Sequence, residues 1–478
     1  MAPATTLPKF AVFKSGANKY MTYVADDASE KCVAVRPNEA WSPRCKFEVV
    51  PSTVHPTMVH IRCSYNNRFL QRLSEAKRWI AALALEPEDN QTLWSSTLFQ
   101  PEFAPNDPMG MVRLLHVQLG RYAHWHDNAN KYVTAEEWNP ADPKTPFQVI
   151  DWGTLVTLPK HLAFRGDNRL LLGLRAGVQV LQFAFSDEKD ETVANQIVPQ
   201  PDGTFRIKNV SRKAFWRANT PSGYQHTYIW ADDVTTADNH TLHSSFAAVK
   251  VNDRTVALRN LGNNLFTRRY SYQITDGLTT IDSQITAVNH LELVELVASR
   301  RIKNIKFHLG ESWVHDETPN VVLNEGEEVR NETDETQDIE VEISYLDKTS
   351  STWMSTSSSF KVGPAVRVQP PQIPYVTDSS VVEMTSPFAP SYVWGETTAE
   401  NPDQVKVHEV TLPPWTMVTV KLLATKATCD VPLTYTRYDK VKGREEVHIM
   451  EDGLYTGTNY FDFTFEESLP QPIPKEDE

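Results

Sequence analysis

The chain is poor in cysteine and glycine, and it has no long hydrophobic run. Its 478 residues include 4 cysteines, 18 glycines and 31 prolines. No two cysteines form a CxxC pair, so a zinc ribbon or finger is disfavoured and reduced thiols in the cytosol are favoured. Proline lacks an N–H and clashes inside a helix, so its excess over glycine disfavours long helices. No stretch approaches the roughly 18 apolar residues of a membrane-spanning helix.

Positive charge is also in deficit. The chain has 47 Lys and Arg against 61 Asp and Glu, a formal net charge of -14. An acidic protein gains nothing from releasing counterions from DNA, so we expect no nucleic-acid partner. Repulsion from anionic lipid means that membrane binding would need a specific receptor. The start, Met1 to Phe10, lacks the basic and apolar regions of a signal peptide, which predicts a cytoplasmic location.

Motifs that would indicate an enzyme are missing. The sequence contains no HExxH, GxSxG, P-loop or GxGxxG pattern. Nothing in it places two carboxylates across a cleft, as glycoside hydrolysis requires. His124 and His126 are two imidazoles without a clear third ligand, which is more typical of a surface loop than of a metal site. We therefore expect no enzymatic activity, no cofactor and no metal.

What the sequence does contain is a repeat of strand, polar turn and strand. Each copy alternates apolar and polar residues with period 2, as in Phe205-Arg-Ile-Lys208, and carries Asn or Gly at a hairpin turn. Three such repeats can close into a barrel with few free edges, so six predict two barrels in an all-β fold. The copies are Phe10–Met21, Val59–Leu70, Val112–Tyr122, His161–Gly173, Thr204–Trp216 and Thr255–Phe266.

Residues 8–298 resemble the amaranthin-type agglutinin, a lectin of two β-trefoil domains. The resemblance rests on four stretches: Thr97–Phe99, Leu114–Gly120, Val149–Trp152 and Phe215–Arg217. It implies a first β-trefoil domain at residues 1–153 and a second at residues 154–299. It also implies binding of a galactose/N-acetylgalactosamine disaccharide and a head-to-tail dimer.

A sugar site needs an aromatic face and fixed polar groups. Trp79 follows Lys77 and Arg78 in a loop that the resemblance assigns to the binding region, and these three residues are the first candidates. Tyr228, in the parallel segment of the second repeat set, and Trp125 are further candidates. Packing in the core is the alternative interpretation for each of these aromatic residues.

The last part of the chain contains a different alternating segment. From Ser358 to Gln369 the even positions are mostly apolar and the odd positions polar or small, as in a membrane β-strand. Pro370–Pro374 reads as a turn, and Val376–Thr385 as a return strand. Pro364 interrupts the first strand, where a missing N–H is tolerated mainly at edges or bulges. The predicted insertion residues are Phe360, Val362, Val366, Val368, Ile373, Val376, Val382 and Met384.

The surrounding sequence resembles the aerolysin-like module of natterin-type and plant lectin-toxin proteins. The stretches that carry this resemblance are Val393–Thr398, Val410–Val420 and Cys429–Tyr435. It implies an elongated β-sheet module at residues 300–466, followed by an acidic, proline-rich tail at residues 467–478. In that family the Ser/Thr-rich hairpin inserts into the membrane.

The sequence therefore predicts a lectin coupled to a pore-forming module. We expect it to reach target membranes through glycosylated receptors and to assemble there as a ring of copies, since a lone hairpin leaves backbone groups unsatisfied in lipid. The alternative is a non-lytic sugar-binding protein whose last module serves only assembly or storage.

Overall fold

The structure is a computed structural model, and it describes residues 6–24, 31–103, 111–126, 132–235 and 241–474. Within these ranges there are strands and short 3₁₀ turns but no α-helix. The all-β fold expected from the sequence is thus confirmed. The 3₁₀ turns are η1 (Pro43–Cys45), η2 (Val117–Leu119), η3 (Trp152–Thr154), η4 (Glu191–Val193), η6 (Leu242–Ser244), η7 (Ala287–Asn289) and η8 (Leu309–Glu311).

Twelve strands form the first barrel. Six of them pair in a closed ring, in the order β1-β4-β5-β8-β9-β12 and back to β1, which leaves that ring without a free edge. The other six form three hairpins, β2–β3, β6–β7 and β10–β11. The strands are β1 (Phe10–Ser15), β2 (Tyr20–Tyr23), β3 (Val33–Arg36), β4 (Phe47–Pro51), β5 (Val59–Cys63), β6 (Arg68–Arg72), β7 (Ile80–Ala84), β8 (Leu98–Phe103), β9 (Met111–His116), β10 (Arg121–His124), β11 (Thr134–Glu137) and β12 (Phe147–Asp151).

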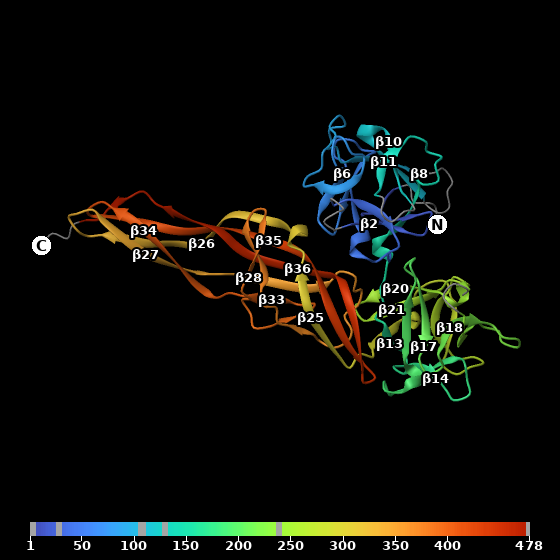
Figure 1. Ribbon diagram of the computed structural model, residues 1–478. Coiled ribbons are helices and arrows are strands. Elements are labelled where there is room, and N and C mark those ends of the chain that lie inside the picture. The colour runs from blue at the N-terminus through green and yellow to red at the C-terminus, as the bar shows by residue number, and fades with distance from the viewer. Residues whose placement is uncertain (1–5, 25–30, 104–110, 127–131, 236–240, 475–478) are drawn as a thin grey trace. The chain divides into compact units, whose positions relative to one another are not determined.

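The second barrel repeats this plan. Its ring runs β13-β16-β17-β20-β21-β24 and back to β13, and its hairpins are β14–β15, β18–β19 and β22–β23. Two six-strand rings with three hairpins each define two β-trefoils (Figure 1). The strands are β13 (His161–Arg165), β14 (Leu171–Leu174), β15 (Leu181–Phe185), β16 (Asn195–Pro199), β17 (Phe205–Asn209), β18 (Ala214–Asn219), β19 (Tyr228–Asp233), β20 (Phe246–Asn252), β21 (Thr255–Asn260), β22 (Phe266–Tyr270), β23 (Gly277–Asp282) and β24 (Leu291–Glu295).

Period-2 alternation builds both cores. Along β9 and β18, buried and partly exposed side chains alternate without interruption. The inward residues of the first barrel gather around Phe13, Phe47 and Phe147, and those of the second around Trp216 and Phe246. Burial of apolar surface at roughly 25 cal/mol per Å² is what makes each ring close.

The remaining strands are longer. A seven-stranded sheet contains β35 and β36, which run side by side as neighbours (Figure 1). Its core contains Trp353, Tyr392 and Tyr455, and a second core lies around Ile343 and Val420. The strands are β25 (Ser299–Phe307), β26 (Trp313–Asn331), β27 (Gln337–Leu346), β28 (Thr349–Ser355), β29 (Arg367–Val368), β30 (Ile373–Asp378), β31 (Val381–Thr385), β32 (Tyr392–Val393), β33 (Thr397–Glu400), β34 (Asp403–Leu412), β35 (Thr416–Val441), β36 (Arg444–Glu467) and β37 (Gln471–Pro472).

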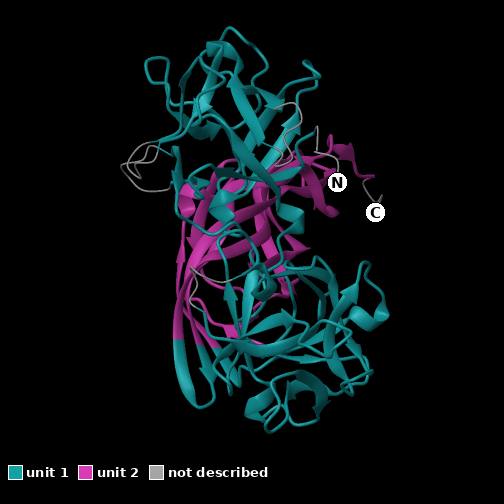
Figure 2. Cartoon of the chain, turned by 90° about the vertical axis from the view of Figure 1, so that its right-hand side faces the viewer, with its two compact units in different colours: residues 1–300, 357–364, 439–446 teal, residues 301–356, 365–438, 447–478 magenta. Residues whose placement is uncertain are grey.

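The chain forms two compact units, and they do not follow a single cut in the sequence. Unit 1 comprises residues 1–300 together with 357–364 and 439–446, and unit 2 comprises 301–356, 365–438 and 447–478. Figure 2 colours them separately. Two short pieces from the last third of the chain, one of them the tip of the β35–β36 hairpin, therefore belong with the barrels.

Candidate functional site

The three hairpins of the first barrel meet one another through single pairs of residues. Cys32 pairs with Ala81, Ala34 with Tyr132, and Trp79 with Thr134. Each pair joins two different hairpins, so the three close a triangle at one end of the barrel. Trp79, immediately before β7, is held at this hairpin cap by its own backbone.

The Trp79 side chain is fixed by its neighbours. It is half-buried, with the Tyr132 ring 5.2 Å away at a 58° tilt and the Lys77 ammonium 4.7 Å from its centre. Arg78 is exposed, and its carbonyl accepts a hydrogen bond of 2.8 Å from the Ala135 N–H. An aromatic face that is partly open and held rigidly is the geometry that sugar stacking requires. A sugar on the face that Lys77 covers would have to displace the ammonium.

Two other residues predicted to contact sugar are buried in the structure. Trp125 is 5% exposed and belongs to the core of the first barrel, and Tyr228 is 0% exposed. A ring without accessible surface cannot stack on a pyranose. The alternation of β19 turns Tyr228 inward, and the core takes up Trp125 because a large apolar ring gains more from burial than from exposure.

The second barrel instead presents an aromatic cluster that sequence reasoning missed. The His226 ring lies 5.1 Å from Tyr270 and 5.4 Å from Tyr272, and the two tyrosines stack at 6.5 Å. Tyr272 is 57% exposed. The Tyr-Ser-Tyr spacing puts both phenol rings on one side of an extended chain, and this period was the available signal.

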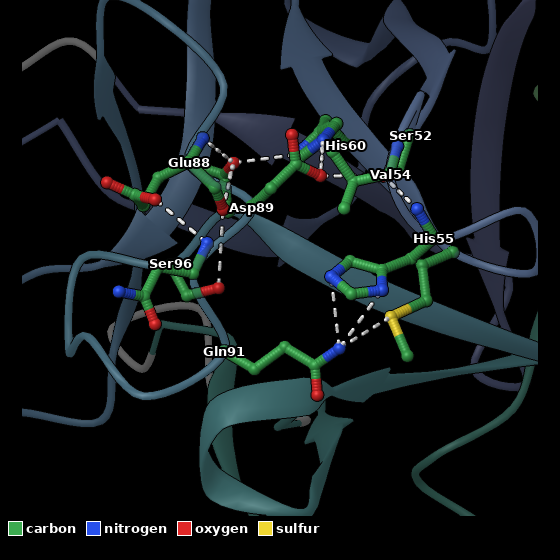
Figure 3. A network of polar contacts seen from close by, with 11 residues as sticks. Ser52, Val54, His55, His60, Glu88, Asp89, Gln91 and Ser96 are labelled. Carbon is green, nitrogen blue, oxygen red and sulfur yellow. Dashed lines mark hydrogen bonds and ion pairs between the residues drawn. The ribbon is translucent and has the colours of Figure 1, made fainter.

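A polar network in the first barrel has the residue types of a hydrolase triad but not its geometry (Figure 3). Ser52 donates its hydroxyl proton to Asp89 at 2.6 Å, and Asp89 lies 3.2 Å from His60 Nε2. The other His60 nitrogen is 2.7 Å from Thr97 Oγ1. A catalytic serine bonds to the histidine, whereas this serine bonds to the carboxylate. His60 is only 2% exposed, and Asp89 links it to Ser52, so the network joins segments that are distant in the sequence.

The Ser357–Pro364 segment, the first half of the expected insertion strand, packs on the second barrel. Phe360 is 6% exposed and lies in that barrel's core cluster, with Val362 against the same cluster. Ser359 Oγ accepts from the Thr157 N–H at 2.9 Å and lies 3.2 Å from Thr157 Oγ1. Lys361 pairs with Asp253 at 3.6 Å. The segment is therefore anchored by one ring and a few polar contacts.

The hairpin predicted to insert into a membrane is not paired in this structure. Ser357–Pro364 forms no strand. Of the predicted first strand, Ser358–Gln369, only Arg367–Val368 is a strand, and this strand, β29, pairs with β32. Gly363 has φ +93° and its Cα faces Glu295, where an added Cβ would lie 1.7 Å from Oε2. Together with Pro364, which has no N–H, it breaks the strand.

The expected return strand also differs. Residues 373–385 fold on themselves as the β30–β31 hairpin, in which Asp378 pairs with Val381. The insertion residues from Val366 onward lie in unit 2: Val366, Val368, Ile373 and Val376 are buried, Val382 packs against the same core, and Met384 is half-buried. The one-sided apolar face is present, but it faces protein cores.

The barrel topology and the hairpin cap define a protein with two β-trefoil domains. Residues 5–137 match the agglutinin domain family, so the first barrel is an agglutinin domain. The family match does not extend to the second barrel, which shares the strand order of the first. The search of curated protein sequences gave no match.

Several solved structures are similar to parts of the chain. The hemolytic lectin CEL-III shows 10% identity over 95% of this chain and 91% of its own, with a TM-score of 0.29. A lamprey immune protein shows 15% identity over 76% and 87%, also at 0.29. A mosquitocidal holotoxin shows 10% identity over 64% of this chain, at 0.29, and the match spans 36% of the holotoxin's length. Among the described residues, no helix has the length and apolar character to cross a membrane.

Proposed function

We propose that the protein is a glycan-binding lectin that permeabilises membranes carrying its ligand. The observation that carries the first half is the agglutinin domain with a rigidly held, partly open Trp79 on its hairpin cap. Galactose- or N-acetylgalactosamine-type glycans are the proposed ligands, with Lys77 and Arg78 supplying donors to sugar hydroxyls. No chemical step is involved.

The second half of the proposal concerns the Ser357–Pro364 segment. Burial of Phe360 stabilises the docked state by roughly 2 kcal/mol, Val362 packs beside it, and the exposed Lys361–Asp253 ion pair adds little. A modest, local free energy thus holds the segment. Release would expose one apolar and one polar face.

Assembly makes such a release productive. Unpaired backbone N–H and C=O groups are costly in lipid, so released segments are stable there only when several copies pair into a closed barrel. Binding to a glycosylated surface concentrates the copies and attaches them at several points. We propose a ring of copies of this chain on the target membrane, reached through glycosylated receptors.

A disulfide clamp tests this function. Thr157→Cys with Ser359→Cys places two thiols where the native oxygens are 3.2 Å apart. The native cysteines are buried, and burial raises the pKa of Cys45 and of Cys429 to about 12, so the new pair should oxidise first. We expect the oxidised variant to bind glycan normally but to release no dye from glycan-bearing vesicles, and reduction to restore release.

The matched control is a clamp in the same barrel that leaves the segment free. Thr220 and Thr227 have hydroxyl oxygens 2.7 Å apart, so Thr220→Cys with Thr227→Cys gives an equivalent disulfide. This control should release dye whether oxidised or reduced. Release that persists with the Thr157–Ser359 clamp closed would remove the segment from the mechanism. Glycan binding without any release would favour a non-lytic lectin.

A further inference from the structure

A second kind of site lies on the β10–β11 hairpin of the first barrel. His124 Nδ1 is 3.9 Å from Glu136 Oε1, and His126 Nε2 is 3.5 Å from the same oxygen. The two imidazole rings are 4.6 Å apart, and the three ligand atoms lie within 4.8 Å of one another. Sequence alone offered two imidazoles and no third ligand, which the fold supplies from the neighbouring strand.

Local backbone geometry explains the convergence. His124 and His126 are two residues apart on extended chain, so their side chains leave on the same side. The register of β10 with β11 shifts between Tyr122 and Ala123, which pair with Glu137 and Ala135, so Glu136 is the extra residue of a β-bulge. A bulge turns a side chain away from the regular alternation. Here it brings Glu136 over the two histidines.

The opposite edge of the His124 ring also meets a carboxylate. His124 Nε2 lies 3.8 Å from Asp142 Oδ1, and that oxygen is held by the Lys144 N–H at 2.8 Å. His124 Nδ1 is buried and has no hydrogen-bond partner in the described structure. Histidines that bind metals commonly give their second ring nitrogen to a carboxylate, which fixes the tautomer and leaves the first nitrogen free to coordinate.

The donor set fits one class of ion. Two imidazole nitrogens and one carboxylate suit Zn²⁺, with bonds of about 2.0–2.2 Å that separate tetrahedral ligand atoms by roughly 3.4 Å. The two distances to Glu136, 3.5 and 3.9 Å, are close to this value, and the two imidazole nitrogens, which lie within 4.8 Å of each other, must also move closer together. The Glu136 side chain is 45% exposed, so solvent can reach a fourth position.

We propose that His124, His126 and Glu136 bind a divalent transition-metal ion, Zn²⁺ by preference, with Asp142 positioning His124. The proposed site does not depend on the proposed sugar or membrane function. Its ligands join the two strands of the β10–β11 hairpin, the same hairpin that supplies Thr134 to the Trp79 pair.

Zinc titration of the full-length protein tests the site. After treatment with EDTA and dialysis, calorimetric titration with ZnCl₂ should show one saturable site, and Co²⁺ should give the intense visible absorption of tetrahedral coordination. Glu136→Gln keeps the size of a solvent-exposed side chain and should weaken Zn²⁺ at least about 100-fold, as should His124→Ala. Asp142→Asn should weaken it about tenfold, because it acts through His124.

Two controls make the outcome decisive. His55→Ala removes an imidazole elsewhere in the same barrel, and Glu75→Gln removes an exposed carboxylate, so both should bind Zn²⁺ as the native chain does. Absence of saturable binding, or binding unchanged by Glu136→Gln, overturns the proposal. Loss of binding with Glu137→Gln instead would also overturn it, because Glu137 and Asp142 share the other edge of His124.

Discussion

At the scale of single residues, burial decides which of the candidate side chains can meet a ligand. The sequence favoured Trp79 over Trp125 and Tyr228 only through the family resemblance, and it could not say which of the three rings is exposed. The barrels bury Trp125 and Tyr228 and leave only Trp79 partly open. Fixed orientation by Tyr132 lowers the entropy that sugar binding would cost.

Removing the Trp79 ring should therefore weaken glycan binding specifically. We expect Trp79→Ala to lower glycan affinity at least about tenfold without lowering the midpoint of thermal unfolding by more than a few degrees. Titration with a glycan chosen from an array measures this. Trp138→Ala is the matched control, because Trp138 belongs to the same barrel and is 72% exposed. Equal affinity for the Trp79→Ala and native proteins would contradict the assignment.

Two adjacent aspartates in β19 provide a sharp stability comparison. Asp233 forms a buried ion pair with Arg206, at 3.1 Å, with side chains 4% and 1% exposed. Asp232 pairs with Arg217 nearer the surface. Asp233→Asn should lower the free energy of unfolding by about 3 kcal/mol because it removes the charged partner of a buried ion pair. Asp232→Asn should cost less than about 1 kcal/mol. Urea denaturation that gave equal losses would contradict this.

At the scale of elements, the alternation of apolar and polar residues predicted which side chains share a face better than it predicted which strands pair. Even positions from Phe360 to Val368 turn toward protein, as the period-2 pattern requires, yet the segment forms almost no strand. Alternation says which side chains share a face, but pairing also needs backbone N–H groups and regular φ angles. Pro364 has no backbone N–H, and Gly363 has a positive φ angle of +93°, so neither residue fits a regular strand.

The tip of the β35–β36 hairpin should respond to acid. Burial opposes the charge of Glu446, but hydrogen bonds from Lys160 Nζ and His161 outweigh it and lower the pKa from 4.5 to about 2. The stabilisation is therefore fully present above about pH 4.5 and is lost as pH falls toward 2. Glu446→Gln should lower the free energy of unfolding by about 1 kcal/mol at pH 7.

Thermal unfolding of Glu446→Gln and native protein across pH measures this effect. The difference between their midpoints should shrink below pH 4.5 and vanish near pH 2. Glu86→Gln, an exposed carboxylate in the first barrel, should show no such convergence. A Glu446→Gln difference that grew on acidification would contradict the assignment.

At the scale of the whole molecule, compact units and sequence segments do not coincide. A boundary near residue 300 is natural from the change in composition, but residues 357–364 and 439–446 belong to unit 1. Both pieces bring apolar or charged side chains to the second barrel, as Phe360 and Glu446 do. The second barrel is therefore completed by chain from beyond its own repeats.

A fragment of residues 1–300 lacks the two later pieces of unit 1 and should therefore be less stable than the same barrels in the full chain. Without Phe360 and Val362, the core of the second barrel gains exposed apolar surface. We expect its unfolding midpoint to fall by about 2–4 °C for each kcal/mol lost, and its binding of an apolar dye to rise. Calorimetry of the fragment against the barrel transition of the full chain measures this. Equal midpoints would mean that the Ser357–Pro364 segment contributes no stability.

The sequence by itself determined the all-β class, the two barrels and the agglutinin resemblance, because alternation, turn residues and repeats are local and survive without knowledge of neighbours. Only the tertiary structure decided that Tyr228 is buried, that Glu136 joins His124 and His126, and that the Ser357–Pro364 segment packs on the second barrel. Each of these depends on a bulge, a close approach or a contact between distant segments. Such contacts are set by how whole elements pack, and the local sequence around each residue does not indicate which distant residue it will contact.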